Sequence, residues 1–104
     1  MWFIRYNKYT EGECMDVLAQ RIKALRTERE LTMDMMVADM KSRYPNIKIE
    51  KSMLSRWEKG ENAPSWENCK YLSMYFDVSL DYLAGLTDTR TPSRLLAMRK
   101  KADE

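Results

Sequence analysis

The sequence contains no histidine, so the side chain most often used as a general base and as a metal ligand is missing. It has two cysteines, Cys14 and Cys69, without the close pairing of a zinc motif, and a four-ligand zinc site cannot be built. A disulfide between them is one alternative, but we expect two reduced thiols, as in intracellular proteins. There is also no glycine-rich phosphate loop. These absences predict a protein without a metal, a cofactor or catalytic activity.

Glycine and proline are scarce, with three of each in 104 residues, which argues against a disordered or collagen-like chain. No apolar run approaches the roughly 18–20 residues that span a membrane. Residues 1–9 are aromatic but soon charged, and they lack the long apolar stretch of a signal peptide. We therefore expect a cytoplasmic protein that does not enter the membrane.

The composition that remains suits one small domain, with 44% hydrophobic and 33% charged residues. The net charge is only +2, which excludes a strongly basic coat. The charge is nevertheless localised. Residues 41–59 carry six basic and two acidic side chains, whereas residues 60–88 carry one basic and five acidic side chains. The first of these stretches is therefore the place to look for an acidic partner.

Apolar residues recur at helical spacing in five separate stretches. Thr32, Ser65 and Ser79 are predicted N-caps, and Gly60 and Gly85 are predicted to follow helix ends. The predicted helices run over 16–29, from Thr32 to before Pro45, over 50–58, from Ser65 to Asp77, and from Ser79 to Gly85. We expect the inward-facing residues to be Leu18, Ile22, Leu25, Met36, Val37, Met40, Ile49, Leu54, Trp57, Trp66, Cys69, Leu72, Ser73, Phe76, Tyr82 and Leu83.

These helices predict an all-α domain over residues 15–88, with an N-terminal extension over 1–14 and a basic C-terminal tail over 89–104. The extension has two readings. Trp2, Ile4 and Tyr6 alternate as in a short strand, while Met15 could equally be the natural start of the chain. A short helix capped by Ser93 could form in the tail, either docked on a partner or frayed.

The helix predicted over 50–58 has the side chains that nucleic-acid recognition requires. Leu54 and Trp57 face inward on one side. The other side collects Lys51, Ser52, Ser55 and Arg56, residue types that bind base edges and phosphates. A solvated helix face would explain the same pattern, so the residues alone leave both readings open.

Three stretches carry a family resemblance: RIKALRTERELT, SMLSRWEKGENAPSWE and LSMYFDVSLDYLAG. From about Ala19 to Gly85 the chain resembles the Cro/CI-type helix-turn-helix domain, also called the XRE or lambda-repressor-like type. The resemblance implies a five-helix DNA-binding fold and a transcriptional regulator, a repressor of phage or mobile-element type. It also implies a homodimer on a palindromic double-stranded DNA operator, with the helix over 50–58 in the major groove.

Matching positions in the family imply two sets of DNA contacts. The residues implied to read bases are Lys51, Ser52, Ser55 and Arg56. The residues implied to contact the DNA backbone are Thr32, Met33, Lys41, Arg43, Lys48, Lys59 and Asn62.

The chain departs from the family pattern in four places. Residues 41–48 lengthen the connection between the second and third of the five helices, and we expect the longer linker to loosen the angle between them. This segment could also extend the second helix or contact the DNA backbone through Lys41, Arg43 and Lys48. Met33 replaces a glutamine, so a polar phosphate contact is lost there. Val37 replaces a small alanine, and Asp77 replaces a glycine, a mild change because aspartate tolerates the left-handed conformation. Two acids near the expected DNA surface, Glu50 and Glu61, oppose phosphate binding but could discriminate between bases.

A protein-interaction module or antitoxin on the same fold is the alternative function. Its interface would use residues 41–48, the aromatic start of the chain and the apolar tail. For the dimer surface the sequence offers only guesses, which are Leu80, Leu83, Leu95 and Leu96.

Overall fold

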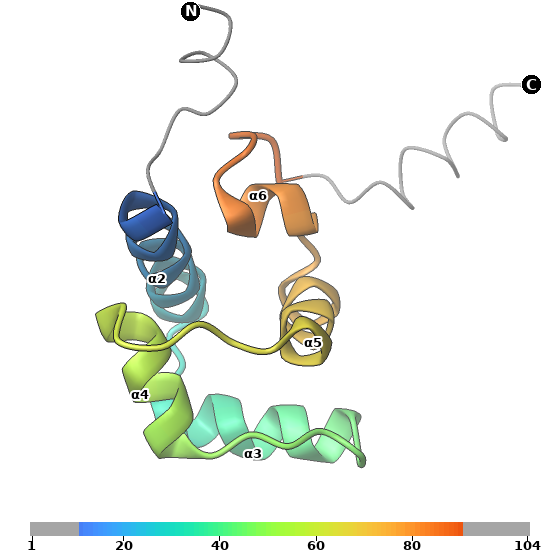
Figure 1. The fold of residues 1–104 in the computed structure, drawn as a ribbon. Coiled ribbons are helices and arrows are strands. Elements are labelled where there is room, and N and C mark those ends of the chain that lie inside the picture. The colour runs from blue at the N-terminus through green and yellow to red at the C-terminus, as the bar shows by residue number, and fades with distance from the viewer. Residues whose placement is uncertain (1–10, 91–104) are drawn as a thin grey trace, which may run out of the picture.

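The computed structural model describes residues 11–90, with side chains from Asp16 onward, and this part of the chain is entirely helical apart from its connections. α2 packs against α4 and α6, α3 packs against α4, and α5 packs against α6 (Figure 1). The predicted all-α class is therefore confirmed for the described residues. The helices are α2 (Glu11–Glu28), α3 (Met33–Arg43), α4 (Lys51–Lys59), α5 (Trp66–Phe76) and α6 (Leu80–Ala84).

The first helix is longer than the sequence predicts. α2 begins at Glu11 rather than at 16, so one continuous helix crosses the predicted border between extension and domain. Its apolar stripe starts only near Leu18, which is why periodicity missed the first turns. The alternation of Trp2 with its neighbours and the predicted tail helix lie outside the described residues.

The predicted helix caps are confirmed. The hydroxyls of Thr32, Ser65 and Ser79 each accept a hydrogen bond from the backbone N–H three residues on, at 3.1, 3.2 and 2.9 Å. Each cap satisfies an N–H group that the helix itself leaves unpaired. The helix ends are closed by left-handed residues with φ of 75°, 55° and 84°, namely Gly60, Asp77 and Gly85.

One core joins all five helices, and most of the predicted inward-facing residues lie in it. On α5, however, the predicted stripe is partly wrong. Trp66 is 70% exposed and Cys69 is only half-buried, whereas Asn68 and Tyr75 are buried and were not predicted. At 100° per residue, Trp66 lies only about 20° around the helix from the buried Ser73, so helical spacing alone does not reveal that this first residue of α5 is exposed.

The connection between α3 and α4 is anchored to the core and to α5. α3 itself takes up Lys41 to Arg43, which leaves residues 44–50 as the connection. Ile47 and Ile49 bury their side chains in the core. The side-chain amide of Asn68 donates to the backbone oxygen of Lys48 at 3.1 Å. Apolar burial and a hydrogen bond from α5 thus fix the route of the chain into α4.

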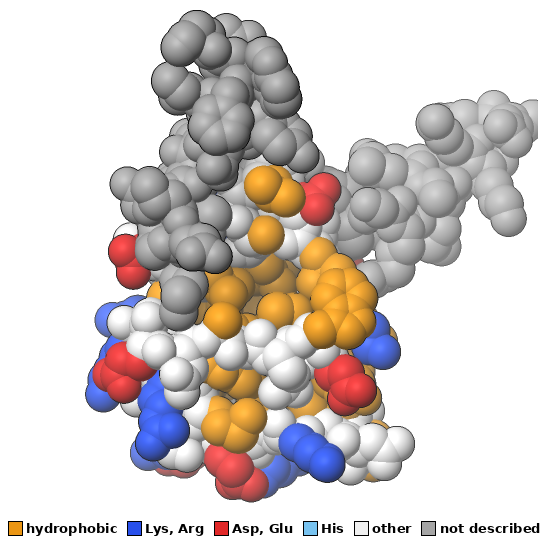
Figure 2. Space-filling model, viewed as in Figure 1, with side chains coloured by type: hydrophobic (Ala, Val, Ile, Leu, Met, Phe, Trp, Pro, Cys, Tyr) orange, Lys and Arg blue, Asp and Glu red, His pale blue; other side chains and the backbone are white. Residues whose placement is uncertain are grey.

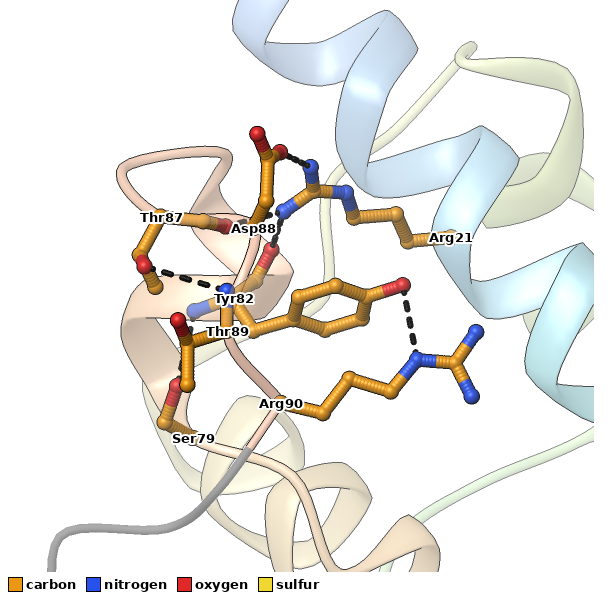
Figure 3. Close-up of polar contacts among 7 residues, drawn as sticks. All are labelled: Arg21, Ser79, Tyr82, Thr87, Asp88, Thr89 and Arg90. Carbon is orange, nitrogen blue, oxygen red and sulfur yellow. Dashed lines mark hydrogen bonds and ion pairs between the residues drawn. The ribbon is translucent and has the colours of Figure 1, made fainter.

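The end of the described chain folds back onto α2 (Figure 3). Arg21 donates to the backbone oxygens of Tyr82 and Thr87 and pairs with Asp88. Its guanidinium lies 4.1 Å from the centre of the Tyr82 ring, and Arg90 donates to the hydroxyl of that tyrosine at 3.2 Å. The two arginines therefore hold α6 and the residues after it against α2.

Candidate nucleic-acid interface

α4 has one buried and one exposed face. Leu54 is fully buried and Trp57 is 4% exposed, so these two side chains fix the inner face in the core. The other face is polar and outward, with Ser55 half-buried and the rest exposed. At 100° per residue these outward residues form a continuous arc of about 140°. They are Lys51, Ser52, Ser55, Arg56 and Lys59.

A buried ion pair holds α4 against α2. Arg26 donates from Nε and Nη2 to the two carboxylate oxygens of Glu58, at 2.7 and 2.9 Å. The Glu58 side chain is only 3% exposed. The hydrogen bond to Glu58 also raises the pKa of Arg26. From Nη1, Arg26 donates to the backbone oxygen of Leu31 at 2.7 Å, so one guanidinium ties together α2, α4 and the turn before α3.

The residues implied to read bases therefore do lie together on one outward surface of α4, but they differ in what they contact. Lys51 pairs with Asp34 at the start of α3, with 3.1 Å between Nζ and Oδ2. Within the described part of the chain, no hydrogen bond or ion pair engages the side chains of Ser52, Ser55 or Arg56. Arg56 thus carries a guanidinium with all its donors free for a partner.

The residues implied to contact the DNA backbone surround α4. Thr32 uses a hydroxyl lone pair to cap α3, and its hydroxyl hydrogen remains available as a donor. Met33 is half-buried and packs against the core, as a methionine rather than a polar residue would. Lys59, the last residue of α4 and of the outward arc, is exposed, as is Asn62 in the loop that follows. Lys48 is exposed on the connection before α4.

Two further members of this set already have acidic partners. Lys41 pairs with Glu50, the residue immediately before α4, at 3.3 Å. Arg43 pairs with Asp39 at 3.5 Å, and its guanidinium lies 5.1 Å from the centre of the Tyr75 ring. Exposed acids therefore lie close to basic side chains around α3 and the start of α4, and Figure 2 shows blue and red side chains intermixed over the part of the molecule where these helices lie.

Sequence reasoning identified Glu50 as an acid of this surface but not its pairing with Lys41. It identified neither Asp34 as the partner of Lys51 nor Glu58 as the buried partner of Arg26. Asp34 and its partner Lys51 are 17 residues apart in the chain, and Glu58 and its partner Arg26 are 32 residues apart. Such distant pairings become visible only when the packing of the helices is known.

A metal centre or a reactive thiol would be another kind of site among the described residues. They contain no group of three or more histidine, cysteine or acidic side chains placed to hold a metal ion. Cys69 is a free cysteine whose pKa is raised by burial, so its thiol is less nucleophilic than an exposed one. No helix among residues 11–90 has the length and apolar character to cross a membrane.

A small helical domain in which one helix supports a second, outward and polar helix is compatible with the helix-turn-helix class of proteins. The chain is 33% identical over 73 residues to an uncharacterized HTH-type transcriptional regulator, YobD, of Bacillus subtilis (strain 168). The match covers 70% of this chain, and this chain spans about three fifths of that protein's length. This similarity supports a helix-turn-helix family. No family model matches the chain. No solved structure matches it significantly.

Proposed function

We propose that the protein is a sequence-specific transcriptional regulator that inserts α4 into the major groove of duplex DNA. The observation that carries the proposal is the outward arc of α4, where Lys51, Ser52, Ser55 and Arg56 project from a helix that a buried ion pair holds in place. Arginine and lysine pair with guanine edges, and a rigid helix keeps such donors in register with the bases. Similarity to an HTH-type transcriptional regulator supports the same function.

The DNA backbone contacts of the proposal come from both ends of this arc. The free hydroxyl hydrogen of Thr32 and the N-terminal turn of α3 suit a phosphate, because N–H groups and the helix dipole favour an anion there. Lys48, Lys59 and Asn62 extend this surface, with Lys41, Arg43 and Met33 at its edge. The protein would work in the cytoplasm, without a cofactor and without catalysis.

The proposed assembly is a homodimer on a palindromic operator, acting as a repressor of phage or mobile-element type. Two copies would place two α4 helices on half-sites about one turn of DNA apart. One of the guessed dimer residues, Leu83, is 1% exposed in the core and is therefore not available for an interface. Leu80 remains half-buried, and Leu95 and Leu96 lie outside the described residues.

The proposal is tested by selecting bound sequences from a random duplex library and titrating the winner at two salt concentrations. We expect a palindromic winner and an affinity that falls steeply between about 50 and 200 mM salt, because phosphate contacts release counterions. Absence of any enriched sequence, together with salt-independent binding, would overturn the proposal.

A protein-interaction module or antitoxin remains the second candidate, and exposed apolar side chains favour it. Trp66 and Leu86 are each 70% exposed, and Met35 and Met74 are about half exposed. Exposed apolar side chains mark a site where another protein binds when they form one continuous patch. A stable complex with the product of a neighbouring gene, formed by a protein that shows no salt-dependent DNA binding, would favour this function over the first.

A further inference from the structure

The start of α4 is bracketed by two ion pairs on the proposed DNA surface. Asp34, in the first turn of α3, contacts Lys51 in the first turn of α4, with 3.1 Å between Oδ2 and Nζ. Glu50, the residue before α4, contacts Lys41 near the end of α3, with 3.3 Å between Oε1 and Nζ. Both acids lie on the surface that would face the phosphates, where a carboxylate repels DNA.

The basic residues of this surface therefore fall into two groups. Lys41 and Lys51 each have a carboxylate within 3.3 Å, and Arg43 has one at 3.5 Å. Arg56, Lys59 and Lys48 have no carboxylate within ion-pair distance in the part of the chain that the structure describes. The second group is available to any stretch of DNA, whereas the first must exchange an acidic partner for a DNA group.

Folding does not account for the two pairs. The side chains of Asp34 and Lys51 are 73% and 59% exposed, and those of Glu50 and Lys41 are 67% and 45% exposed. Exposed ion pairs of this kind contribute little to stability. The helices are held instead by the buried core and by the Arg26 pair with Glu58. The exposed acids can thus be neutralised without loss of the fold.

The physical effect of these acids depends on the DNA sequence. Binding to random DNA rests almost entirely on phosphate contacts, so every carboxylate on the surface weakens it. Binding to the correct operator adds hydrogen bonds from side chains such as Lys51 to base edges. On the operator, the hydrogen bonds to bases compensate for the loss of the ion pair between Lys51 and Asp34. On random DNA only phosphate contacts form, and they do not compensate for that loss.

We propose that Asp34 and Glu50 are specificity-determining residues, which weaken binding to non-operator DNA more than binding to the operator. This inference rests on the proposed function and concerns how the same surface discriminates between operator and non-operator DNA. Each acid opposes non-specific association, and it leaves Lys51 and Lys41 to engage DNA fully only where α4 matches the bases.

The experiment measures the affinity of the full chain and of the variants Asp34→Asn and Glu50→Gln for two duplexes. One duplex is the winner of the random-library selection, and the other is a scrambled sequence of equal length. Glu67→Gln is the matched control, because Glu67 is an exposed acid on α5 without an ion pair. We expect each test variant to bind scrambled DNA about fivefold more tightly, the effect of one nearby charge in water. The gain on the operator should be smaller.

The outcomes separate this inference from the proposed function. No salt-dependent binding of either duplex by the unaltered chain would overturn both. Binding by the unaltered chain, with equal gains on both duplexes in Asp34→Asn and Glu50→Gln, would overturn the inference alone. Weaker operator binding with unchanged scrambled binding would also overturn it, because Asp34 would then only position Lys51. Thermal unfolding followed by circular dichroism confirms that each variant folds.

Discussion

The Arg26 guanidinium and the Glu58 carboxylate face each other through two hydrogen bonds, at 2.7 and 2.9 Å, between α2 and α4. Both side chains are largely buried, with 12% and 3% exposed. Glu58 lies beside the buried Leu54 on α4, about 20° around the helix from Lys51, which is at the edge of the arc proposed to read DNA. Because Leu54, Trp57 and Glu58 fix one side of α4 against the rest of the domain, they also fix the direction in which its outer face points.

Glu58→Ala should lower the free energy of unfolding by about 3 kcal/mol, since removing one partner leaves the buried arginine without compensation. Urea unfolding of the variant and the unaltered chain measures the difference. Asp88→Ala is the matched control, because it removes an exposed partner of Arg21 and should cost less than about 1 kcal/mol. Equal losses in the two variants would show that burial does not distinguish the pairs.

Arg56→Ala should weaken operator binding by about 1–3 kcal/mol and relax the preference at one base pair, because a bidentate contact to a base is lost. Repeating the library selection with the variant reveals the relaxed position. Lys23→Ala, which removes an exposed lysine from α2, should leave both affinity and preference unchanged. An unaltered binding motif in Arg56→Ala would remove this residue from the base-reading set.

Lys59→Ala should weaken binding to every duplex by a similar factor, as expected for a contact to phosphate. The slope of log affinity against log salt should become shallower by about 1, because one fewer counterion is released. Titrations at several salt concentrations give this slope, and Lys70→Ala on α5 serves as the comparison. A change in sequence preference with an unchanged slope would contradict a phosphate role.

Stability should fall at high pH through Tyr75. Burial, followed by the hydrogen bond to Asp39, raises the pKa of Tyr75 from its ordinary value near 10 to about 12. Because the folded pKa is the higher one, this contribution is fully present below pH 10 and is lost as the pH rises toward 12. Unfolding free energies measured across that window should decline more steeply for the unaltered chain than for Tyr75→Phe. Parallel curves would show that the hydroxyl ionises equally in both states.

The local features of the fold could be predicted from the sequence, because each depends on a few neighbouring residues. Thr32, Ser65 and Ser79 cap their helices as predicted, and the left-handed Asp77 ends α5. Trp66 fits the helical spacing of the α5 stripe, yet it is 70% exposed. Spacing does not show how far the core extends along a helix, and Trp66 is the first residue of α5.

The sequence predicts the outward arc of α4, since the spacing of Leu54 and Trp57 defines the inner face. It does not predict the contacts that this site makes with other helices. The pairing of Lys51 with Asp34 could not be predicted, because it depends on how α3 crosses α4. From the sequence, the length of the segment over 41–48 predicted a looser angle between the two helices, but length alone does not show how the segment is held. Its anchoring depends on a hydrogen bond from Asn68, twenty residues farther along the chain.

The connection before α4 has an exposed tip, where residues can be replaced or inserted, and a buried part, where they cannot. Its tip, Pro45 and Asn46, is exposed, and the chain turns there with the Ile47 N–H donating to the Tyr44 oxygen at 2.9 Å. Ile47 and Ile49 then re-enter the core before α4 begins. Residues inserted at the tip would form a longer outward loop, since loop length adds little to the entropic cost of closure. A peptide epitope could therefore be inserted between residues 45 and 46 while α4 keeps its orientation.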